Sequence, residues 1–130
     1  MRKRSLPRPT DAELEILSVL WTRGACTVRE VYEEINGTKP TGYTTVLKLM
    51  QIMTEKGLVT RNEQERAHVY EAAMAREETQ RQLIGELLNR AFDGSAASLV
   101  MQALSAKKSS RAELARIREM LDDLEGDAKR

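Results

Sequence analysis

The sequence has very few of the residues from which catalytic and metal sites are usually built. Its 130 residues include one cysteine, Cys26, and one histidine, His68. A single cysteine excludes an intramolecular disulfide, and the lack of a cysteine and histidine cluster excludes the ligand pattern of a zinc site. The glycine spacing matches neither the phosphate-binding loop nor the dinucleotide-binding fingerprint. We therefore expect a protein that is not an enzyme and that needs no cofactor and no metal.

Aromatic residues and long apolar runs are also scarce. Aromatic residues make up 4% of the chain and hydrophobic residues 41%, so a core can form but must be mainly aliphatic and methionine. No apolar run approaches the roughly 20 residues of a membrane span, and the basic residues near the start are not followed by the apolar core of a signal peptide. Together with the lack of a disulfide, these absences predict a cytoplasmic location.

Neither sign of charge dominates. The chain has 21 lysine and arginine residues against 20 aspartate and glutamate residues, a net charge of +1. This balance argues against a polybasic coat protein but not against a DNA-binding protein, which needs a basic face rather than a basic total. Residues 1–9 hold four of the basic residues and two prolines, which predicts a flexible basic arm. Residues 126–130 are expected to be a frayed tail.

Three copies of the capping-box pattern predict where helices begin. A serine or threonine is followed three residues later by glutamate at 10–13, 27–30 and 110–113. Gly24 is expected to end the first helix, and the Asn-Gly pair at 36–37 the second. Two of these helices therefore follow each other closely in the first third of the chain.

A third helix and a hairpin come next. The helix is expected to be capped by Thr41 or Thr44 and to end at Gly57. The runs 58–63 and 67–72 carry β-branched or aromatic residues in near alternation, which predicts a β-hairpin.

Three helices followed by a hairpin predict a winged helix-turn-helix domain over residues 10–74. The fold class is therefore mainly α with a small β-hairpin, and the winged-helix domain is followed by a helical dimerisation domain. The apolar positions at helical spacing form the predicted core of the first domain. They are Leu14, Leu17, Trp21, Val31, Ile35, Val46, Leu49, Met50 and Met53.

Residues 75–125 form the predicted dimerisation domain. Its helices have broad apolar stripes, and about 50 residues are too few to bury them alone, so we expect a homodimer. The alternative is that these helices fold back on the winged-helix domain of the same chain. A twofold protein would match a twofold operator. The predicted dimerisation residues are Leu83, Leu87, Leu88, Phe92, Leu99, Val100, Leu104, Leu114, Ile117, Leu121 and Leu124.

The third helix is the predicted DNA-reading element, because such a helix enters the major groove in helix-turn-helix proteins. Thr44 and Thr45 can serve bases or phosphates, and Lys48 suits a phosphate or a guanine edge. Tyr43 can donate to a phosphate, with a ring packed on the first turn as the equal alternative. Gln51 is a weaker candidate, and Arg29, Arg61 and Arg66 are candidates for contacts to backbone phosphates. Glutamates beside the two hairpin arginines predict a small contribution from the hairpin.

Two other readings stay open. A winged-helix domain can serve as a protein-interaction module that does not touch DNA. Cys26 could make the protein a redox or small-molecule sensor, although a small, partly buried apolar role fits it better. His68 lies in a predicted strand without local partners, so a structural role is expected for it rather than catalysis.

Seven segments of the chain together resemble the penicillinase-repressor (BlaI/MecI-type) family of transcriptional regulators. They cover the winged-helix half densely and reach the start of the second half. The segments are LEIL at 14–17, VLW at 19–21, TVREV at 27–31, YTTVL at 43–47, EKGLV at 55–59, RAHVY at 66–70 and FDGS at 92–95.

This resemblance implies a homodimeric repressor of a palindromic DNA operator, with derepression by a membrane sensor-protease that cleaves the C-terminal half. Three places depart from the family pattern. Ile52 stands where an arginine is common, and the hairpin tip at 64–66 is not a basic turn with glycine. The segment 101–103 reads Met-Gln-Ala where staphylococcal members carry the cleaved Asn–Phe pair. Clustered C-terminal cysteines of the copper-responsive branch are also missing.

Overall fold

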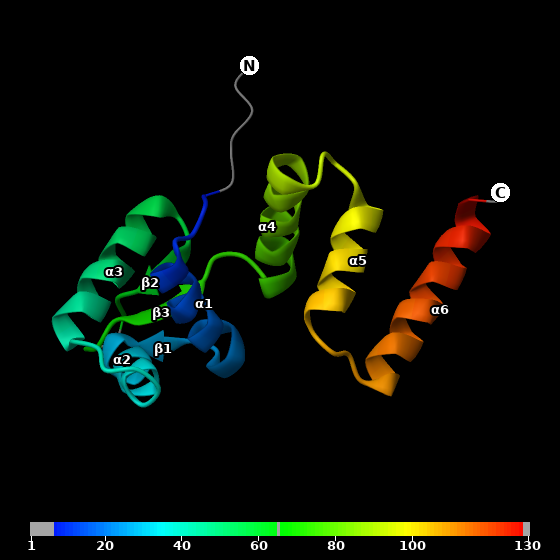
Figure 1. Ribbon diagram of the computed structural model, residues 1–130. Helices are drawn as coiled ribbons and strands as arrows, with labels where there is room; N and C mark the ends of the chain where they lie inside the picture. The colour runs from blue at the N-terminus through cyan, green and yellow to red at the C-terminus, as the bar shows by residue number, and fades with distance from the viewer. Residues whose placement is uncertain (1–6, 65, 129–130) are drawn as a thin grey trace, which may run out of the picture. The chain divides into compact units, whose positions relative to one another are not determined.

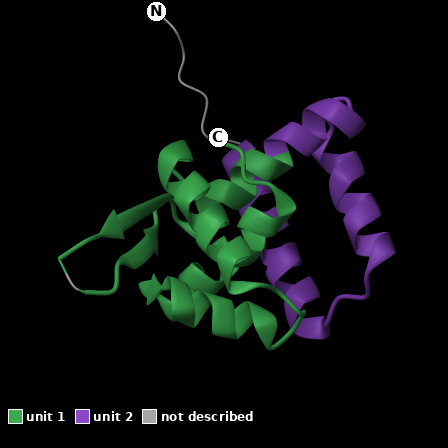
Figure 2. Ribbon diagram, turned by 90° about the vertical axis from the view of Figure 1, so that its left-hand side faces the viewer, with its two compact units in different colours: residues 1–84 green, residues 85–130 purple. Residues whose placement is uncertain are grey.

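The computed structural model describes residues 7–64 and 66–128. Residues 1–6 of the expected basic arm and the last two residues of the expected tail lie outside the described part. The chain divides into two compact units, residues 1–84 and 85–130 (Figure 2). The elements in chain order are α1 (Asp11–Arg23), β1 (Cys26–Thr27), α2 (Val28–Asn36), α3 (Tyr43–Lys56), β2 (Val59–Asn62), β3 (Val69–Ala72), α4 (Arg76–Ala91), α5 (Ala96–Ala106) and α6 (Arg111–Ala128) (Figure 1).

All three predicted capping boxes are present. At the start of α1, the Thr10 hydroxyl accepts from the Glu13 N–H at 3.2 Å, and the Glu13 carboxylate accepts from the Thr10 N–H at 2.8 Å. The same reciprocal bonds begin α2 at 27–30 and α6 at 110–113. The backbone N–H groups that these carboxylates accept from lower the pKa of the glutamates at positions 30 and 113. The predicted starts of these helices are confirmed.

The start of α3 differs from the prediction. Its N-cap is Gly42, which has no side chain to cap the helix. Thr41 lies one residue too early, and its hydroxyl donates to the Lys39 carbonyl at 2.9 Å instead. Thr44 already lies inside the helix, so neither predicted cap was right. Asn36 fixes the turn by accepting from the Thr41 N–H at 3.0 Å, which leaves glycine at the cap.

The sheet has one strand more than the predicted hairpin. Its order is β1-β3-β2, with antiparallel pairing throughout. The hairpin of β2 and β3 is confirmed, with Val59 opposite Ala72 and Asn62 opposite Val69. The added strand β1 has two residues and pairs Cys26 with Tyr70. Two residues are too short to show the alternation by which strands are recognised in a sequence.

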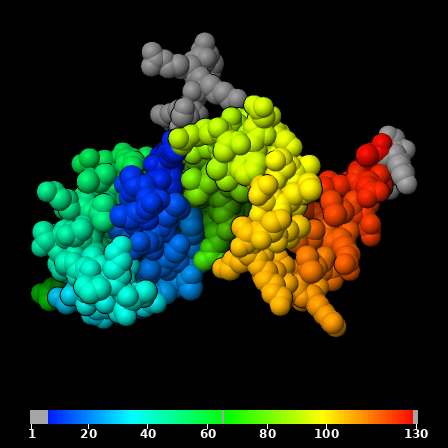
Figure 3. Space-filling model, viewed as in Figure 1, coloured from blue at the N-terminus to red at the C-terminus, as the bar shows by residue number. Residues whose placement is uncertain are grey.

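The core of unit 1 is aliphatic and methionine-rich, as its composition predicted. Five predicted core residues are buried, namely Leu17, Val31, Val46, Met50 and Met53. Four others are only partly buried and pack against that core, which corrects the prediction: Leu14, Trp21, Ile35 and Leu49. The remaining buried members among the described residues are Ile16, Leu20, Cys26, Val28, Leu58, Val59 and Tyr70. On the surface, α1, α2 and α3 meet without a break (Figure 3).

Trp21 lies at the edge of the core because its indole N–H makes a hydrogen bond. Its Nε1–H donates to the Met74 carbonyl at 2.9 Å, so the ring lies where the chain leaves the sheet. Arg76 stacks 5.8 Å from the centre of the same ring and donates to the Thr22 hydroxyl at 3.0 Å. Thr79, one turn further along α4, is buried. These contacts make the first turns of α4 part of unit 1, which extends to residue 84.

Unit 2 contains the end of α4 with α5 and α6. None of its described residues, 85–128, is buried. Asp93 and Gly94 both have positive φ and separate α4 from α5, and Ser95 caps α5 as its sequence suggests. The helix α6 continues to Ala128. Gly126 does not take the left-handed conformation with which Gly57 ends α3.

Candidate nucleic-acid interface

The helices α2 and α3 form a helix-turn-helix, and α3 presents a polar face to solvent. Its inner side is buried through Val46, Met50 and Met53. The predicted DNA-facing residues lie on the other side, and all are exposed: Thr44, Thr45, Lys48 and Gln51. Ile52, at 42% exposed, adds an apolar patch to the later turns of this face.

The N-terminal end of α3 is open to a ligand. Because Gly42 provides no side-chain cap, the first N–H groups of the helix have no side-chain partner. These groups and the helix dipole make the end favourable for an anion such as a phosphate. The helices α1, α2 and α6 differ, since their capping boxes already occupy such groups.

A hollow of about 240 Å³ lies next to this helix end. It brings together Arg29 at the start of α2, Tyr43 at the start of α3, and Arg66 and His68 on the hairpin side. Three of these four were predicted DNA-binding residues. Sequence reasoning missed His68, which is exposed and lines the hollow. It stands two residues after Arg66, in the connection that precedes β3, and its closeness to that candidate in the sequence was the available signal.

Tyr43 joins the two helices through its ring. The ring lies edge-on to that of Tyr32, with centroids 5.6 Å apart, and the Arg29 guanidinium lies 5.2 Å from its centre. The alternative of a packed ring is therefore present in the structure. Tyr43 is nevertheless 39% exposed, so packing does not remove it from the surface.

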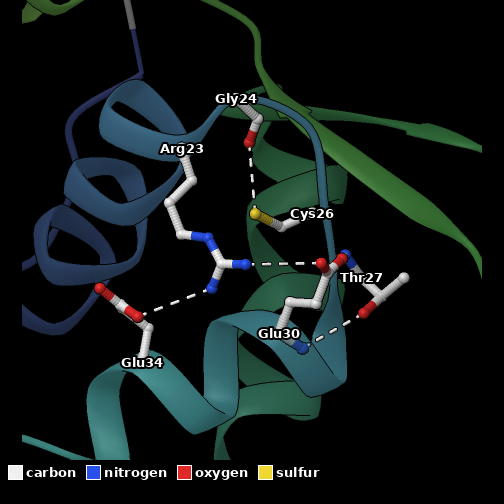
Figure 4. Close-up of polar contacts among 6 residues, drawn as sticks. All are labelled: Arg23, Gly24, Cys26, Thr27, Glu30 and Glu34. Carbon is white, nitrogen blue, oxygen red and sulfur yellow. Dashed lines mark hydrogen bonds and ion pairs between the residues drawn. The ribbon is translucent and has the colours of Figure 1, made fainter.

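The pairing of charges separates the basic residues of unit 1 into two groups. Within 10–74, four have carboxylate partners: Arg23 with Glu30 and Glu34 at 3.5 and 3.6 Å (Figure 4), Lys39 with Glu15 at 3.4 Å, Lys56 with Glu13 at 2.7 Å, and Arg61 with Glu63 at 2.6 Å. The other three have no carboxylate partner among the described residues. They are Arg29, Lys48 and Arg66, all of them predicted DNA-binding residues.

Arg61 is less available than its position in the hairpin suggested. Its hydrogen bond to Tyr70, the residue opposite it on β3, and its neighbour Glu63 raise the pKa of its guanidinium. The charge that a phosphate would need is already compensated by the Glu63 carboxylate. This agrees with the expectation that the hairpin contributes little through this residue.

Cys26 has the environment of a structural thiol. It is 2% exposed and its Sγ–H donates to the Gly24 carbonyl at 3.3 Å (Figure 4). Burial raises the pKa of the thiol, which disfavours the reactive thiolate. The nearby Arg23 is held by two glutamates. These features argue against the sensor reading.

No described group of three histidine, cysteine, aspartate or glutamate side chains is arranged to hold a metal ion. None of the described helices is long and apolar enough to span a bilayer.

These features define a winged helix-turn-helix protein. The sequence profile of the penicillinase repressor family matches residues 9–123, and the chain belongs to that family. It is 23% identical over 120 residues to a penicillinase repressor of Bacillus licheniformis, covering 92% of this chain and 94% of the relative. It is 34% identical over 89 residues to a transcriptional regulator BlaI of Mycobacterium tuberculosis, covering 68% of this chain and 64% of the relative. Membership makes the chain a transcriptional repressor.

Solved structures agree on the fold. The solution structure of the DNA binding domain of the repressor BlaI matches with a TM-score of 0.51 and 24% identity, covering 58% of this chain and 93% of that one. The monomeric form of Bacillus licheniformis BlaI in complex with the blaP half-operator matches with a TM-score of 0.50 and 24% identity, covering 57% and 90%. The predicted winged-helix fold is confirmed.

Proposed function

We propose that this repressor acts as a homodimer on a palindromic DNA operator, with the first turns of α3 in the major groove. One observation carries the proposal. Three cations of residues 10–74 have no carboxylate partner among the described residues, and these three, Arg29, Lys48 and Arg66, belong to α3 or to segments next to its open N-terminal end. The solved relative in complex with a half-operator supports the same use of this fold.

Each residue has a distinct task in this proposal. Thr44 and Thr45 serve bases or phosphates near the start of α3, and Lys48 serves a phosphate or a guanine edge one turn later. Arg29 and Arg66 grip phosphates from the two sides of the hollow, with Tyr43 between them and His68 beside Arg66. Gln51 and Arg61 contribute less.

The apolar faces of unit 2 support the homodimer. Leu87, Val100, Leu121 and Leu124 are between 43% and 53% exposed, which leaves a broad apolar surface in the single chain. A second copy would cover such surfaces by symmetric pairing and would hold two α3 helices at a half-site spacing of about 34–36 Å. The proposal also places the chain in the cytoplasm, where its operator DNA lies.

Regulation by a membrane sensor-protease is the finer part of the proposal, and it rests on the family resemblance. The segment 101–103 lies inside α5, where Met101 is 68% exposed. Because this segment lacks the Asn–Phe pair of the staphylococcal members, cleavage would use another bond of the C-terminal half. Such a cut would remove part of the apolar surface of the proposed dimer.

Gel-shift measurements on the intergenic DNA upstream of the chain's own gene test the interface. We expect Lys48→Ala to weaken binding and to lower the salt slope by about 2 for a dimer, because one phosphate contact is lost in each half-site. Arg29→Ala and Arg66→Ala should act similarly. Lys39→Ala is the matched control, since Lys39 is already paired with Glu15. Equal losses in Lys39→Ala and Lys48→Ala would contradict the assignment of the face.

A further inference from the structure

An ion pair between a buried carboxylate and a lysine whose side chain is 34% exposed joins α1 to the far end of α3. Glu13 is 2% exposed, and its Oε1 accepts from the Lys56 ammonium at 2.7 Å. The same oxygen accepts from the Thr10 N–H in the α1 capping box at 2.8 Å. One carboxylate atom thus connects the start of one helix to the last turn of the other. The two helices also pack against each other.

Lys56 lies where α3 ends and the chain turns into the hairpin, so its contact with Glu13 acts on that junction. Lys56 is the last residue of α3, and Gly57 follows in the left-handed conformation with φ of 82°. The Leu58 N–H donates back to the Met53 carbonyl at 2.9 Å, and β2 begins at Val59. The ion pair therefore fixes the point where the DNA-reading helix ends and the hairpin begins.

The other ion pairs described within residues 10–74 have no buried carboxylate. The pair of Lys39 with Glu15 is longer, at 3.4 Å, and both side chains are about half exposed or more, at 67% and 47%. Solvent screens such a pair, so it contributes little to geometry. A buried carboxylate is different, because it needs its partner and holds that partner in place.

We propose that Glu13 and Lys56 are positioning residues that set the angle of α3 for operator discrimination. This inference rests on the proposed function. Lys56 acts through α3 and not by touching DNA, because its ammonium is held by Glu13. With the end of α3 released, the helix would lose the fixed orientation that lets its first turns meet particular base edges, while phosphate contacts would tolerate the change.

The test compares specific with non-specific binding. The specific probe is a duplex that the wild-type chain itself selects from a random pool, and the reference is a scrambled duplex of equal length and composition. We expect Glu13→Gln to lower the ratio of the two affinities roughly tenfold, the size of one lost base contact. Lys56 is freed in this variant, so binding to the scrambled duplex should not weaken. Measurements are made at a temperature where circular dichroism shows the variant fully folded.

Two further variants separate positioning from other roles. Lys56→Arg keeps the charge and should retain the wild-type ratio, whereas Glu15→Gln removes the exposed pair on the same helix and should also retain it. If Glu13→Gln does not fold, the double variant Glu13→Gln/Lys56→Met, which leaves no unpaired charge, takes its place with the same expectation.

The outcomes are distinct. An unchanged ratio in Glu13→Gln, or in the double variant used in its place, overturns the positioning role and leaves the proposed function intact. A lower salt slope in the double variant Glu13→Gln/Lys56→Met than in the wild type, with an unchanged ratio, means that Lys56 contacts phosphate directly, which also overturns it. A wild-type chain that selects no sequence from the pool overturns the proposed function, and the positioning role with it.

Discussion

The two units of the chain solve the burial of apolar surface in opposite ways. Unit 1 closes a core in which Val31, Met50 and Met53 are 0% exposed. Unit 2 has no buried residue in its described part, although α5 carries no charged side chain and α6 has an apolar stripe. Unit 1 thus buries a core of its own, whereas the apolar side chains of unit 2 stay exposed in the described part of the single chain. A helical unit with exposed leucines is therefore best understood as half of an interface.

The largest expected effect comes from placing a charge in that interface. Leu121→Asp should convert the proposed homodimer to a monomer and lower operator affinity by about a hundredfold or more, because the two half-sites are no longer bound together. Light scattering and gel-shift titration measure the two effects. Ala115→Asp, on the opposite face of α6, introduces the same charge as a control. If light scattering gave Leu121→Asp the same mass as the wild type, the apolar surface of unit 2 would not be the dimer interface, and the contrast between the two units would fail.

Side-chain truncation gives the next largest effect and contrasts the two units directly. Met50→Ala should lower the free energy of unfolding of unit 1 by about 2–5 kcal/mol, since it removes a completely buried side chain. Leu124→Ala, at a residue that is 53% exposed in the single chain, should weaken stability only through dimerisation. Thermal unfolding at several protein concentrations distinguishes them. A concentration-independent loss in Leu124→Ala would mean that unit 2 has a core of its own.

The boundary between the units can be sharpened at Trp21. Trp21→Phe removes the donor to the Met74 carbonyl and should destabilise unit 1 by about 1–2 kcal/mol. Chemical denaturation followed by circular dichroism reports the change. Because this bond ties the start of α4 to α1, the variant should also expose the backbone amides of 76–79 to faster hydrogen exchange. Unchanged hydrogen exchange at 76–79 would mean that unit 1 ends at residue 74.

Acid gives the smallest expected effect, and it acts on unit 1. Burial alone would raise the pKa of Glu13, but the hydrogen bonds from Lys56 and Thr10 outweigh it, and the pKa is lowered. Because the pKa is lower in the folded state, ionised Glu13 stabilises the protein when the pH is above the ordinary glutamate pKa of about 4.3. This stabilisation is lost as the pH falls through the pKa of the folded state. Below about pH 4.3, stability should therefore decline more steeply in the wild type than in Glu13→Gln. Parallel denaturation curves across this range for both proteins would contradict this.

Local signals in the sequence predicted much of the fold. The capping boxes, the hairpin and Gly57 depend on residues close together in the chain, and all were found where the pattern indicated. The cap of α3 was mispredicted because Thr41 is used by the turn before it. The strand β1 was missed because it exists only by pairing with β3, far along the sequence.

The sequence predicted which residues could contact DNA, but it did not show which of these side chains are already held by other residues of the chain. Glutamates stand beside both Arg61 and Arg66 in the sequence, and only the structure shows which of the two arginines is paired, with Arg61 held by Glu63. Lys56 is the clearest case. Its partner Glu13 lies 43 residues away, so no local pattern could reveal that this lysine serves the fold.

The salt dependence of wild-type binding to its own upstream DNA tests the central claim most directly. Three cations of each copy have no carboxylate partner in the described part of the chain, so two copies predict about six phosphate contacts, and hence a slope of log affinity against log salt near −5. A slope of that size, with protection of two half-sites about one helical turn apart, is the expected result. No binding at low salt, or a slope near zero, would contradict a homodimeric DNA-binding repressor.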